Sequence, residues 1–343
     1  MTITIRLLDS GSARAWDAFV HSMPLGTFFH RAAWAKVIET AFRHRPYFVF
    51  AERDGSITGV LPLVQVKTLL FGHSLVSSPF CVYGGPLAAD TESSAALESH
   101  AMALQDRTGA SVLEFRYRDP VESDWVEPPD LYVTFRKPID WDHEVNMRAI
   151  PRKQRAMVRK AFINGLTSIA DRDVPRMHGI YAESVRNLGT PVFSQRYFAA
   201  LMDAFGDDAD IVTVLDGAVP IASVLNFYFR DEVLPYYGGG TLAARQRAGN
   251  DFLYWEVMRR AAERGVRLFD FGRSKIGTGA YSFKHNWGFE PKKLNYRFRL
   301  APGQLIPEVN PMNPKYRMLI AAWKRLPLPV ANLLGPSIVR GLG

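Results

Sequence analysis

The chain has 343 residues, of which 47% are hydrophobic and 22% charged, a composition that is typical of a globular protein and excludes a disordered chain. At about 150 residues per domain, this length predicts two domains. The net charge of +8 favours an anionic partner, and the single cysteine excludes a disulfide framework and a paired-cysteine zinc or redox site.

The first residues predict a strand, because Ile3, Ile5 and Leu7 alternate with polar residues. They lack the basic start and long apolar core of a signal peptide. The longest apolar run, residues 211–229, is divided by Asp216-Gly217 and so predicts a hairpin rather than a membrane span. We therefore expect a cytoplasmic protein.

Four features recur in the same order in the two halves of the chain, at offsets of about 154 to 164 residues. They are an aromatic residue before a His or Ser cap and a helix, a hairpin with an Asp-Gly turn, a Tyr-Gly-Gly strand end, and a final strand after a helix. The first copies lie at 27–34, 47–67, 83–87 and 109–116, and the second copies at 191–198, 210–230, 237–242 and 265–272. We infer two copies of one α/β unit with a mixed, largely antiparallel sheet flanked by helices. The expected domains are 1–139 and 140–310, followed by a basic tail at 311–343.

The second copy is richer in polar, glycine and aromatic residues, so we expect the chemistry there and acceptor binding or scaffolding in the first copy. Asp270 ends a predicted strand, where α/β sites gather, and Gly272 allows a tight exit. Tyr281 and Lys284 lie three residues apart on one short predicted helix and are therefore neighbours. A positioned lysine can stabilise negative charge on a carbonyl or a phosphate. His285 is on the same helix, but a lone histidine is more often solvated or packed.

Residues 246–251 lead into a predicted helix at 251–264. Backbone N–H groups near Gly249 and Asn250 would suit a phosphate or a developing oxyanion. The alternative is an ordinary helix start capped by Asn or Asp.

Residues 145–170 contain six basic residues and no acidic one. Arg152, Arg155 and Arg159 share one face of a helix that begins near Pro151. This face would attract phosphates of RNA, of a nucleotide-linked sugar or of lipid headgroups, or it is a solvated surface.

The tail at 311–343 has five basic residues, no acidic residue and many apolar ones. Such a segment can lie on an anionic membrane, here the inner membrane. Alternatively it is a helical tail that packs on the body, since Pro327, Pro329 and Pro336 break any long amphipathic helix.

Several enzyme classes are excluded by motifs that the sequence lacks. It has no GxSxG, Walker, strand-linked GxGxxG or HExxH motif, and its histidines have no ligand spacing. A serine hydrolase or a metal hydrolase is therefore not expected, and neither is a bound metal.

The tandem units, the basic segment 151–155 and the segments 269–274 and 281–289 resemble FemAB-type proteins. The resemblance is closest to FemAB-related proteins of bacterial exopolysaccharide and PEP-CTERM/exosortase loci, and it covers about residues 25–300. It implies two GNAT-like domains and acyl transfer to an amine. It also implies that Phe283-Lys284 is the family's Phe-Lys pair, which lines the donor site and steadies the transfer intermediate.

The resemblance leaves the acyl donor open between aminoacyl-tRNA and acyl-coenzyme A. Peptidoglycan-bridge members use aminoacyl-tRNA and a lysine of a cell-wall precursor, but this chain has no room for the coiled-coil arm of some of them. Segment 246–251 is a degenerate form of the GNAT pyrophosphate loop, with Asp251 where Gly or Ala is expected. A carboxylate there would repel the pyrophosphate of coenzyme A.

The leading hypothesis is an N-acyltransferase or aminoacyltransferase acting on an amino group of a cell-envelope or exopolysaccharide precursor. Lys284 would stabilise the oxyanion, and Asp270 or Tyr281 would orient or deprotonate the amine. The candidate donor-binding and substrate-binding residues are Phe283, Arg273, Tyr236, Tyr237, Gly249, Asn250, Arg152, Arg155 and Arg159. The alternatives are a non-catalytic binding protein of polysaccharide assembly and a general RNA binder.

Overall fold

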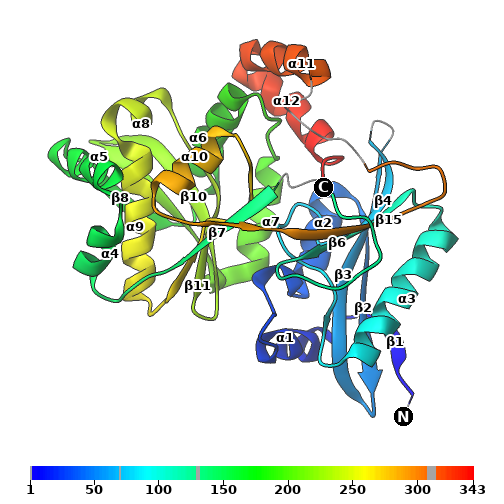
Figure 1. Cartoon of the computed structure of the whole chain (residues 1–343). Helices are drawn as coiled ribbons and strands as arrows, with labels where there is room; N and C mark the ends of the chain where they lie inside the picture. The colour runs from blue at the N-terminus through cyan, green and yellow to red at the C-terminus, as the bar shows by residue number, and fades with distance from the viewer. Residues whose placement is uncertain (1, 69–70, 129–131, 307–313) are drawn as a thin grey trace. The chain divides into compact units, whose positions relative to one another are not determined.

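The computed structural model describes residues 2–68, 71–128, 132–306 and 314–343 (Figure 1). The chain divides into two compact units. Unit 1 comprises residues 1–130, 294–309 and 340–343, and unit 2 comprises residues 131–293 and 310–339. Each unit contains a mixed sheet flanked by helices, which confirms the predicted α/β fold class.

Unit 1 is built on a sheet with the strand order β1-β2-β3-β4-β6-β15, in which only the described pair β4–β6 is parallel. The apolar side of α3 packs on this sheet and forms the core with residues such as Leu97, Leu61 and Leu113. The elements of unit 1 are β1 (Thr4–Leu7), α1 (Ala13–Ser22), η1 (Phe28–His30), α2 (Ala33–Phe42), β2 (Arg45–Arg53), β3 (Ser56–Thr68), β4 (Gly72–Ser77), β5 (Leu87–Ala88), α3 (Thr91–Thr108), β6 (Val112–Tyr117) and β15 (Asn295–Leu300).

The sheet of unit 2 has the order β13-β7-β12-β11-β10-β9-β8. Helix α9 packs on one face, against Val212 and Val224, while α6 and α7 meet the other face at Tyr237. The strands are β7 (Tyr132–Pro138), β8 (Thr167–Asp171), β9 (Ala209–Asp216), β10 (Val219–Phe229), β11 (Glu232–Gly240), β12 (Leu268–Asp270), β13 (Ser274–Lys275) and β14 (Pro291–Lys293). The helices are α4 (His143–Ala149), α5 (Arg152–Ile163), α6 (Val174–Leu188), α7 (Gln195–Phe205), α8 (Leu242–Arg247), α9 (Gly249–Glu263), α10 (Gly279–Asn286), α11 (Pro314–Arg325) and α12 (Leu328–Val339).

The two sheets repeat one strand order. The series β1-β2-β3-β4-β6 of unit 1 recurs as β8-β9-β10-β11-β12 of unit 2, with one parallel pair at the same place. The hairpins β2–β3 and β9–β10 turn at Asp54-Gly55 and Asp216-Gly217 as predicted. Gly55 and Gly217 have φ angles of 76° and 60°, the left-handed region that a tight hairpin turn requires.

Two of the four predicted sequence matches are not structurally equivalent. Tyr83 lies in a loop after β4, whereas Tyr237 lies inside β11. His30 ends the short 3-10 helix η1 and does not cap α2, whereas Ser194 caps α7 by accepting a hydrogen bond from the backbone N–H of Tyr197. Local similarity of sequence was misleading here because the loop after β4 has no counterpart in the second copy.

Each sheet is completed by a strand from the other side of the predicted domain boundary. Strand β7 follows β6 in the chain but pairs antiparallel with β12, and β15 pairs antiparallel with β6. The predicted boundary at 139/140 is therefore wrong, because β7 belongs to unit 2 and residues 294–306 belong to unit 1. The other predicted boundary, at 310/311, lies outside the described residues.

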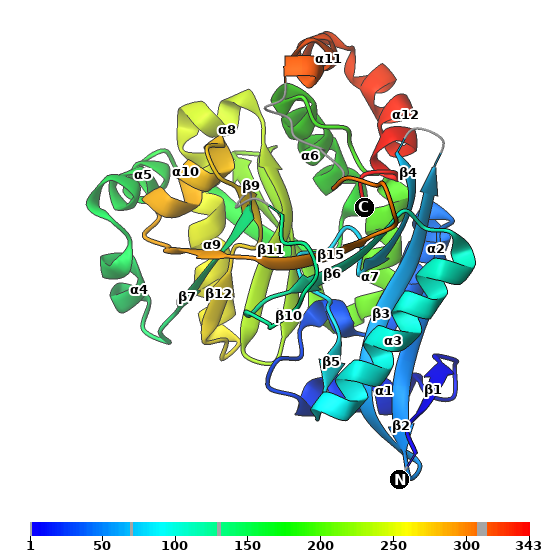
Figure 2. The ribbon, with the colours of Figure 1, turned by 45° about the vertical axis from the view of Figure 1, so that its right-hand side comes forward.

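The C-terminal segment forms α11 and α12, which both contact α6 within unit 2 (Figures 1 and 2). Pro327 separates the two helices, as the prolines predicted, and Pro336 lies inside α12. Among the helices that the structure describes, none is long and apolar enough to span a membrane.

Candidate functional site

The end of β12 is closed by a buried network centred on Asp270. Its Oδ1 accepts hydrogen bonds from the backbone N–H of Gly272 (2.7 Å) and the hydroxyl of Thr134 (3.3 Å), and its Oδ2 lies 3.1 Å from the Nε of Arg136. Gly272 has a φ of 65°, which gives the tight exit that the sequence predicted. Asp270 is only 1% exposed, so this position supports the turn rather than contact with a substrate amine.

Lys284 reaches back from α10 to this same turn. Its ammonium donates to the carbonyls of Phe271 (2.7 Å), Gly272 (3.1 Å) and Arg273 (3.1 Å). Burial lowers the pKa of Lys284 to about 7, and the nearby charge of Asp270 opposes that decrease. A lysine in this state changes charge near neutral pH, a property that is typical of functional sites.

Three further candidates surround Lys284 with aromatic surface. The ring of Tyr281 packs edge-on against Phe135 at 5.4 Å, and the guanidinium of Arg273 lies 4.9 Å from the ring centre of Tyr132. Phe283 packs in the cluster formed by Tyr254, Phe271 and Trp287. Tyr281, Phe283 and Arg273 are partly exposed, so each can contribute to the wall of a site.

Tyr236 and Tyr237 are adjacent in sequence but have different surroundings. The β10–β11 register passes from Leu225↔Tyr237 to Asn226↔Pro235, so Tyr236 is the extra residue of a β-bulge. A Cβ on Gly272 would lie 3.7 Å from the Tyr236 ring, which places that ring at the turn held by Lys284. Tyr237 is buried, and its hydroxyl lies 2.7 Å from that of Tyr197, so the prediction that Tyr237 lines a groove is wrong.

The bulge lies where two parallel strands separate. Strands β11 and β12 pair only at Glu232↔Leu268 and Val233↔Phe269. Beyond these pairs β11 continues to Gly240, whereas β12 ends at Asp270 and the chain turns away. The Tyr236 ring, the Gly272 turn and Lys284 therefore meet at the carboxyl end of β12, where sites of α/β proteins gather.

The start of α9 differs from the predicted anion site. Gly249 is buried, and a Cβ there would lie 3.0 Å from Ile221 and 3.1 Å from the Cα of Ala244, so this glycine permits close packing of α8 and α9. The Oδ1 of Asn250 would lie 2.2 Å from a Cβ on Gly240, so the side chain of Asn250 packs against β11. Neither placement supports the prediction that backbone N–H groups near Gly249 and Asn250 donate hydrogen bonds to an anion.

Asp251 points into the protein rather than toward an approaching phosphate. It is 8% exposed, and its Oδ1 accepts a hydrogen bond from the indole N–H of Trp287 at 3.1 Å. Burial raises the pKa of Asp251 to about 6. The predicted repulsion between this carboxylate and coenzyme A therefore does not hold.

The basic helix α5 begins beside the end of α10. Pro151 caps α5, and a Cβ on Gly288 would lie 3.1 Å from the Pro151 ring. Together with the Asp251–Trp287 hydrogen bond, this contact brings the starts of α5 and α9 to the end of α10. Arg152 and Arg159 are exposed and Arg155 is partly exposed. Of the predicted apolar side, Val158 and Ala161 face the core, whereas Phe162 is 50% exposed.

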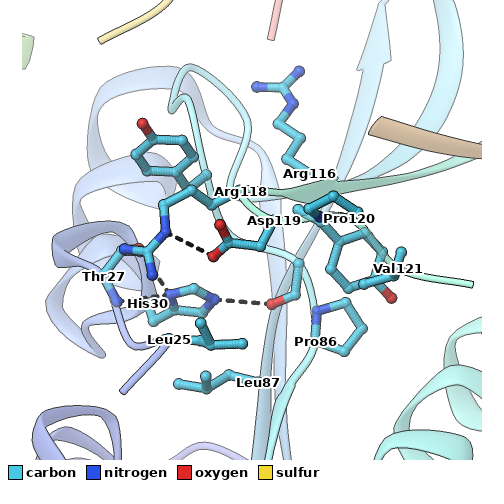
Figure 3. Close-up of a pocket in the computed structure, with 13 residues that line it drawn as sticks. Leu25, Thr27, His30, Pro86, Leu87, Arg116, Arg118, Asp119, Pro120 and Val121 are labelled. Atoms are coloured by element: carbon cyan, nitrogen blue, oxygen red, sulfur yellow. Dashed lines mark hydrogen bonds and ion pairs between the residues drawn. The ribbon is translucent and has the colours of Figure 1, made fainter. Parts of the chain in front are cut away.

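Unit 1 contains a pocket that the sequence did not predict, with a cavity of about 70 Å³ (Figure 3). The Nε2–H of His30 donates to the Gly85 carbonyl at 2.9 Å, while its Nδ1 accepts from the backbone N–H of Thr27. Burial lowers the pKa of His30 to about 4, so the ring is neutral at pH 7. Figure 3 shows Arg118 paired with Asp119 next to this ring, with Nε to Oδ2 at 3.0 Å. The signal for this pocket was the charged residues directly after the strand that ends at Tyr117.

Arg136 is a further residue that sequence reasoning missed. It pairs from β7 with both Asp270 and Glu232, and through Asp270 it supports the turn that Lys284 contacts. Its signal was the alternation of Thr134 and Arg136 with apolar residues in β7, since an arginine inside a largely buried strand requires an acidic partner.

Comparisons with known proteins agree with this architecture. Residues 150–285 match the profile of the acetyltransferase (GNAT) domain, and they extend from just before α5 to the penultimate residue of α10. No curated protein sequence matches the chain.

Three solved structures illustrate the shared fold. A crystal structure of FemX matches with a TM-score of 0.67 and 16% identity, over 87% of this chain and 97% of that one. The C-terminal domain of a putative lysylphosphatidylglycerol synthetase from Agrobacterium fabrum matches with a TM-score of 0.54 and 13% identity, over 85% and 93%. A tandem GNAT protein from the clavulanic acid biosynthesis pathway matches with a TM-score of 0.52 and 12% identity, over 88% and 100%. The chain therefore has the fold of tandem GNAT proteins.

Proposed function

We propose that unit 2 transfers an acyl or aminoacyl group from an activated donor to an amine. The observation that carries this proposal is the position of Lys284. Its ammonium lies on the Gly272 turn, where β11 and β12 separate and where Tyr236 bulges out of β11. The GNAT profile match spans these elements, and the likeness to FemX supports the same class of reaction.

The reaction needs stabilisation of one negative charge and transfer of one proton. The amine nitrogen attacks the acyl carbonyl carbon, a C–N bond forms, and the bond from that carbon to the sulfur or oxygen of the donor breaks. Lys284 releases one of its carbonyl partners and donates to the developing oxyanion. Tyr281, one helical turn before Lys284, gives a proton to the leaving group and regains one from solvent, while the amine releases its proton to solvent. Asp270 then acts as a positioning residue, because its buried carboxylate holds the turn.

The donor remains a choice between acyl-coenzyme A and aminoacyl-tRNA, and the buried position of Asp251 removes one objection to coenzyme A. We propose that Arg152, Arg155 and Arg159 of α5, the helix that begins beside the end of α10, bind phosphates of the donor or acceptor. The acceptor class that we propose is an amino group of a cell-envelope or exopolysaccharide precursor in the cytoplasm. The pocket beside His30 in unit 1 is the candidate site for part of that acceptor.

The test is transfer of labelled acyl groups by the purified protein. Labelled acetyl-coenzyme A and a labelled aminoacyl-tRNA pool are offered separately with extracted envelope precursors, and label in the acceptor is measured. We expect Lys284→Ala to lower kcat by about 100- to 1000-fold, the usual effect of removing an oxyanion donor. Lys292→Ala, at an exposed lysine of the same unit, is the matched control.

The pH dependence distinguishes an oxyanion donor from a purely structural lysine. Since the pKa of Lys284 is near 7, its ammonium form is lost as the pH rises through about 7. We therefore expect kcat of the wild type to fall as the pH rises through about 7. Lys284→Arg keeps the charge and should abolish this fall. Full activity of Lys284→Ala would refute the mechanism.

One observation favours a second candidate, a non-catalytic binding protein of polysaccharide assembly. All three N–H groups of Lys284 are taken by backbone carbonyls, and Asp270 is buried, so neither reaches a substrate without rearrangement. This candidate predicts binding of a precursor without turnover of either donor, and the same transfer assay separates the two.

A further inference from the structure

One side of helices α11 and α12 is fixed to unit 2. Gly335 approaches Val192 so closely that a Cβ on it would lie 2.8 Å from the Val192 backbone N. Ala331 and Val339, on the same side of α12, are buried. Arg186 of α6 donates to the carbonyl of Leu326 at 3.2 Å, where the chain passes from α11 to α12. The inner side of the helix pair is therefore covered.

The outer side of the same pair exposes large apolar side chains. Met318 and Leu319 of α11 are 82% and 65% exposed, and Leu333 of α12 is 77% exposed. Leu334 and Val330 are also exposed, as is Leu188 of α6, next to the Gly189 that contacts Ile320. A group of this size on consecutive helices is unusual for a surface that faces only water.

The charge of this outer side is positive. Arg325, two turns after Met318, is exposed on this side, and Lys324 is exposed beside α6, since a Cβ on Gly189 would lie 3.1 Å from its Cε. Residues 311–343 contain five basic and no acidic residues, although the side chains of Lys315 and Arg317 lie outside those that the structure describes. Exposed apolar side chains beside cations match the chemistry of an anionic lipid surface.

We propose that the outer side of α11 and α12 docks on an anionic lipid bilayer. The helices lie in the interface, because each has 12 residues and is about 18 Å long, shorter than the roughly 30 Å of a bilayer core. Met318, Leu319 and Leu333 enter the acyl boundary, and Lys324 and Arg325 contact lipid phosphates. Aliphatic side chains on two projecting helices, with no acidic residue among them, fit a fluid anionic surface better than a shaped protein groove.

The experiment measures flotation of the full-length protein with vesicles. Mixed phosphatidylcholine–phosphatidylglycerol vesicles are compared with pure phosphatidylcholine vesicles at low and high salt. We expect binding to the anionic vesicles that decreases with salt. Met318→Glu/Leu319→Glu should lower the partition coefficient by tenfold or more. Lys324→Glu/Arg325→Glu should lower it by at least about fivefold for each cation.

Matched control variants show whether a loss of vesicle binding comes from the tail itself rather than from unfolding or from a change in net charge. Val219→Glu replaces an exposed apolar residue elsewhere in unit 2, and Lys36→Glu/Lys292→Glu makes the same charge change outside the tail. Both controls should bind as the wild type does, and circular dichroism melts check that every variant is folded. Equal binding of the tail variants and the wild type overturns the proposal. So does absence of vesicle binding by the wild type together with a dimer that Met318→Glu/Leu319→Glu dissociates, since the surface would then join two copies of the chain.

Discussion

The buried carboxyl of Asp251 should make unit 2 less stable as the pH rises. Its pKa is raised from 3.8 to about 6 by burial, despite the hydrogen bond from Trp287. Because the folded state binds this proton more tightly than the unfolded state does, the stabilisation is complete below pH 3.8 and is lost as the pH rises through about 6. Roughly two pKa units correspond to about 3 kcal/mol of unfolding free energy.

Asp251→Asn removes the charge and keeps an oxygen that can accept from Trp287. We expect this variant to exceed the wild type by about 1–3 kcal/mol at pH 8, and the gain to shrink toward zero near pH 4. Calorimetric melts between pH 5 and pH 8 measure the difference, at about 2–4 °C per kcal/mol for a unit of this size. Asp203→Asn, at an exposed aspartate in the same unit, should show no such trend. A gain that is equal at pH 5 and pH 8, or a loss at pH 8, would refute the argument.

Two further predictions concern buried ionisable groups, one in each unit. The pKa of His30 is lowered from 6.5 to about 4, so unit 1 should lose about 3 kcal/mol of unfolding free energy as the pH falls from 6.5 through 4, and His30→Gln should flatten that dependence in urea titrations. Arg136→Met leaves Asp270 and Glu232 without their shared cation and should lower the unfolding free energy by about 3–5 kcal/mol. The double variant Arg136→Met/Asp270→Asn should recover a part of that loss. If the double variant is no more stable than Arg136→Met, the ion pair is not buried as described.

The repeated architecture was predictable because hairpins and helices leave local signals. Asp-Gly turns between apolar runs predicted both hairpins, and the spacing of apolar residues located α9 to within two residues of its bounds. The sheet to which β7 and β15 belong was not predictable, since an edge strand of the same apolar pattern can pair with either sheet. That choice depends on hydrogen bonds between segments more than 100 residues apart, which no local pattern records.

Some of the candidate residues lie together in the fold, but their surroundings were not predicted. Lys284, Arg273 and Asp270 do meet at the end of β12, because the strand, the tight turn and the following helix were all visible in the sequence. Burial was not visible, and it confines Asp270 to the turn and raises the pKa of Asp251. The bulge at Tyr236 was also hidden, because a one-residue irregularity in pairing leaves the sequence of β11 unchanged.

The partners of β6 and β12 also bear on how the chain folds during synthesis. Strand β6 ends at Tyr117, but its antiparallel neighbour β15 begins at Asn295. At 5–20 residues per second, the ribosome needs roughly 10 to 35 s to produce the intervening chain. Throughout that interval the edge of β6 has no native neighbour, and an open edge of this kind is a template for incorrect pairing. Unit 2, whose β7 is made before β12, meets no such delay at the corresponding edge, so the second unit can finish its sheet before the first one does.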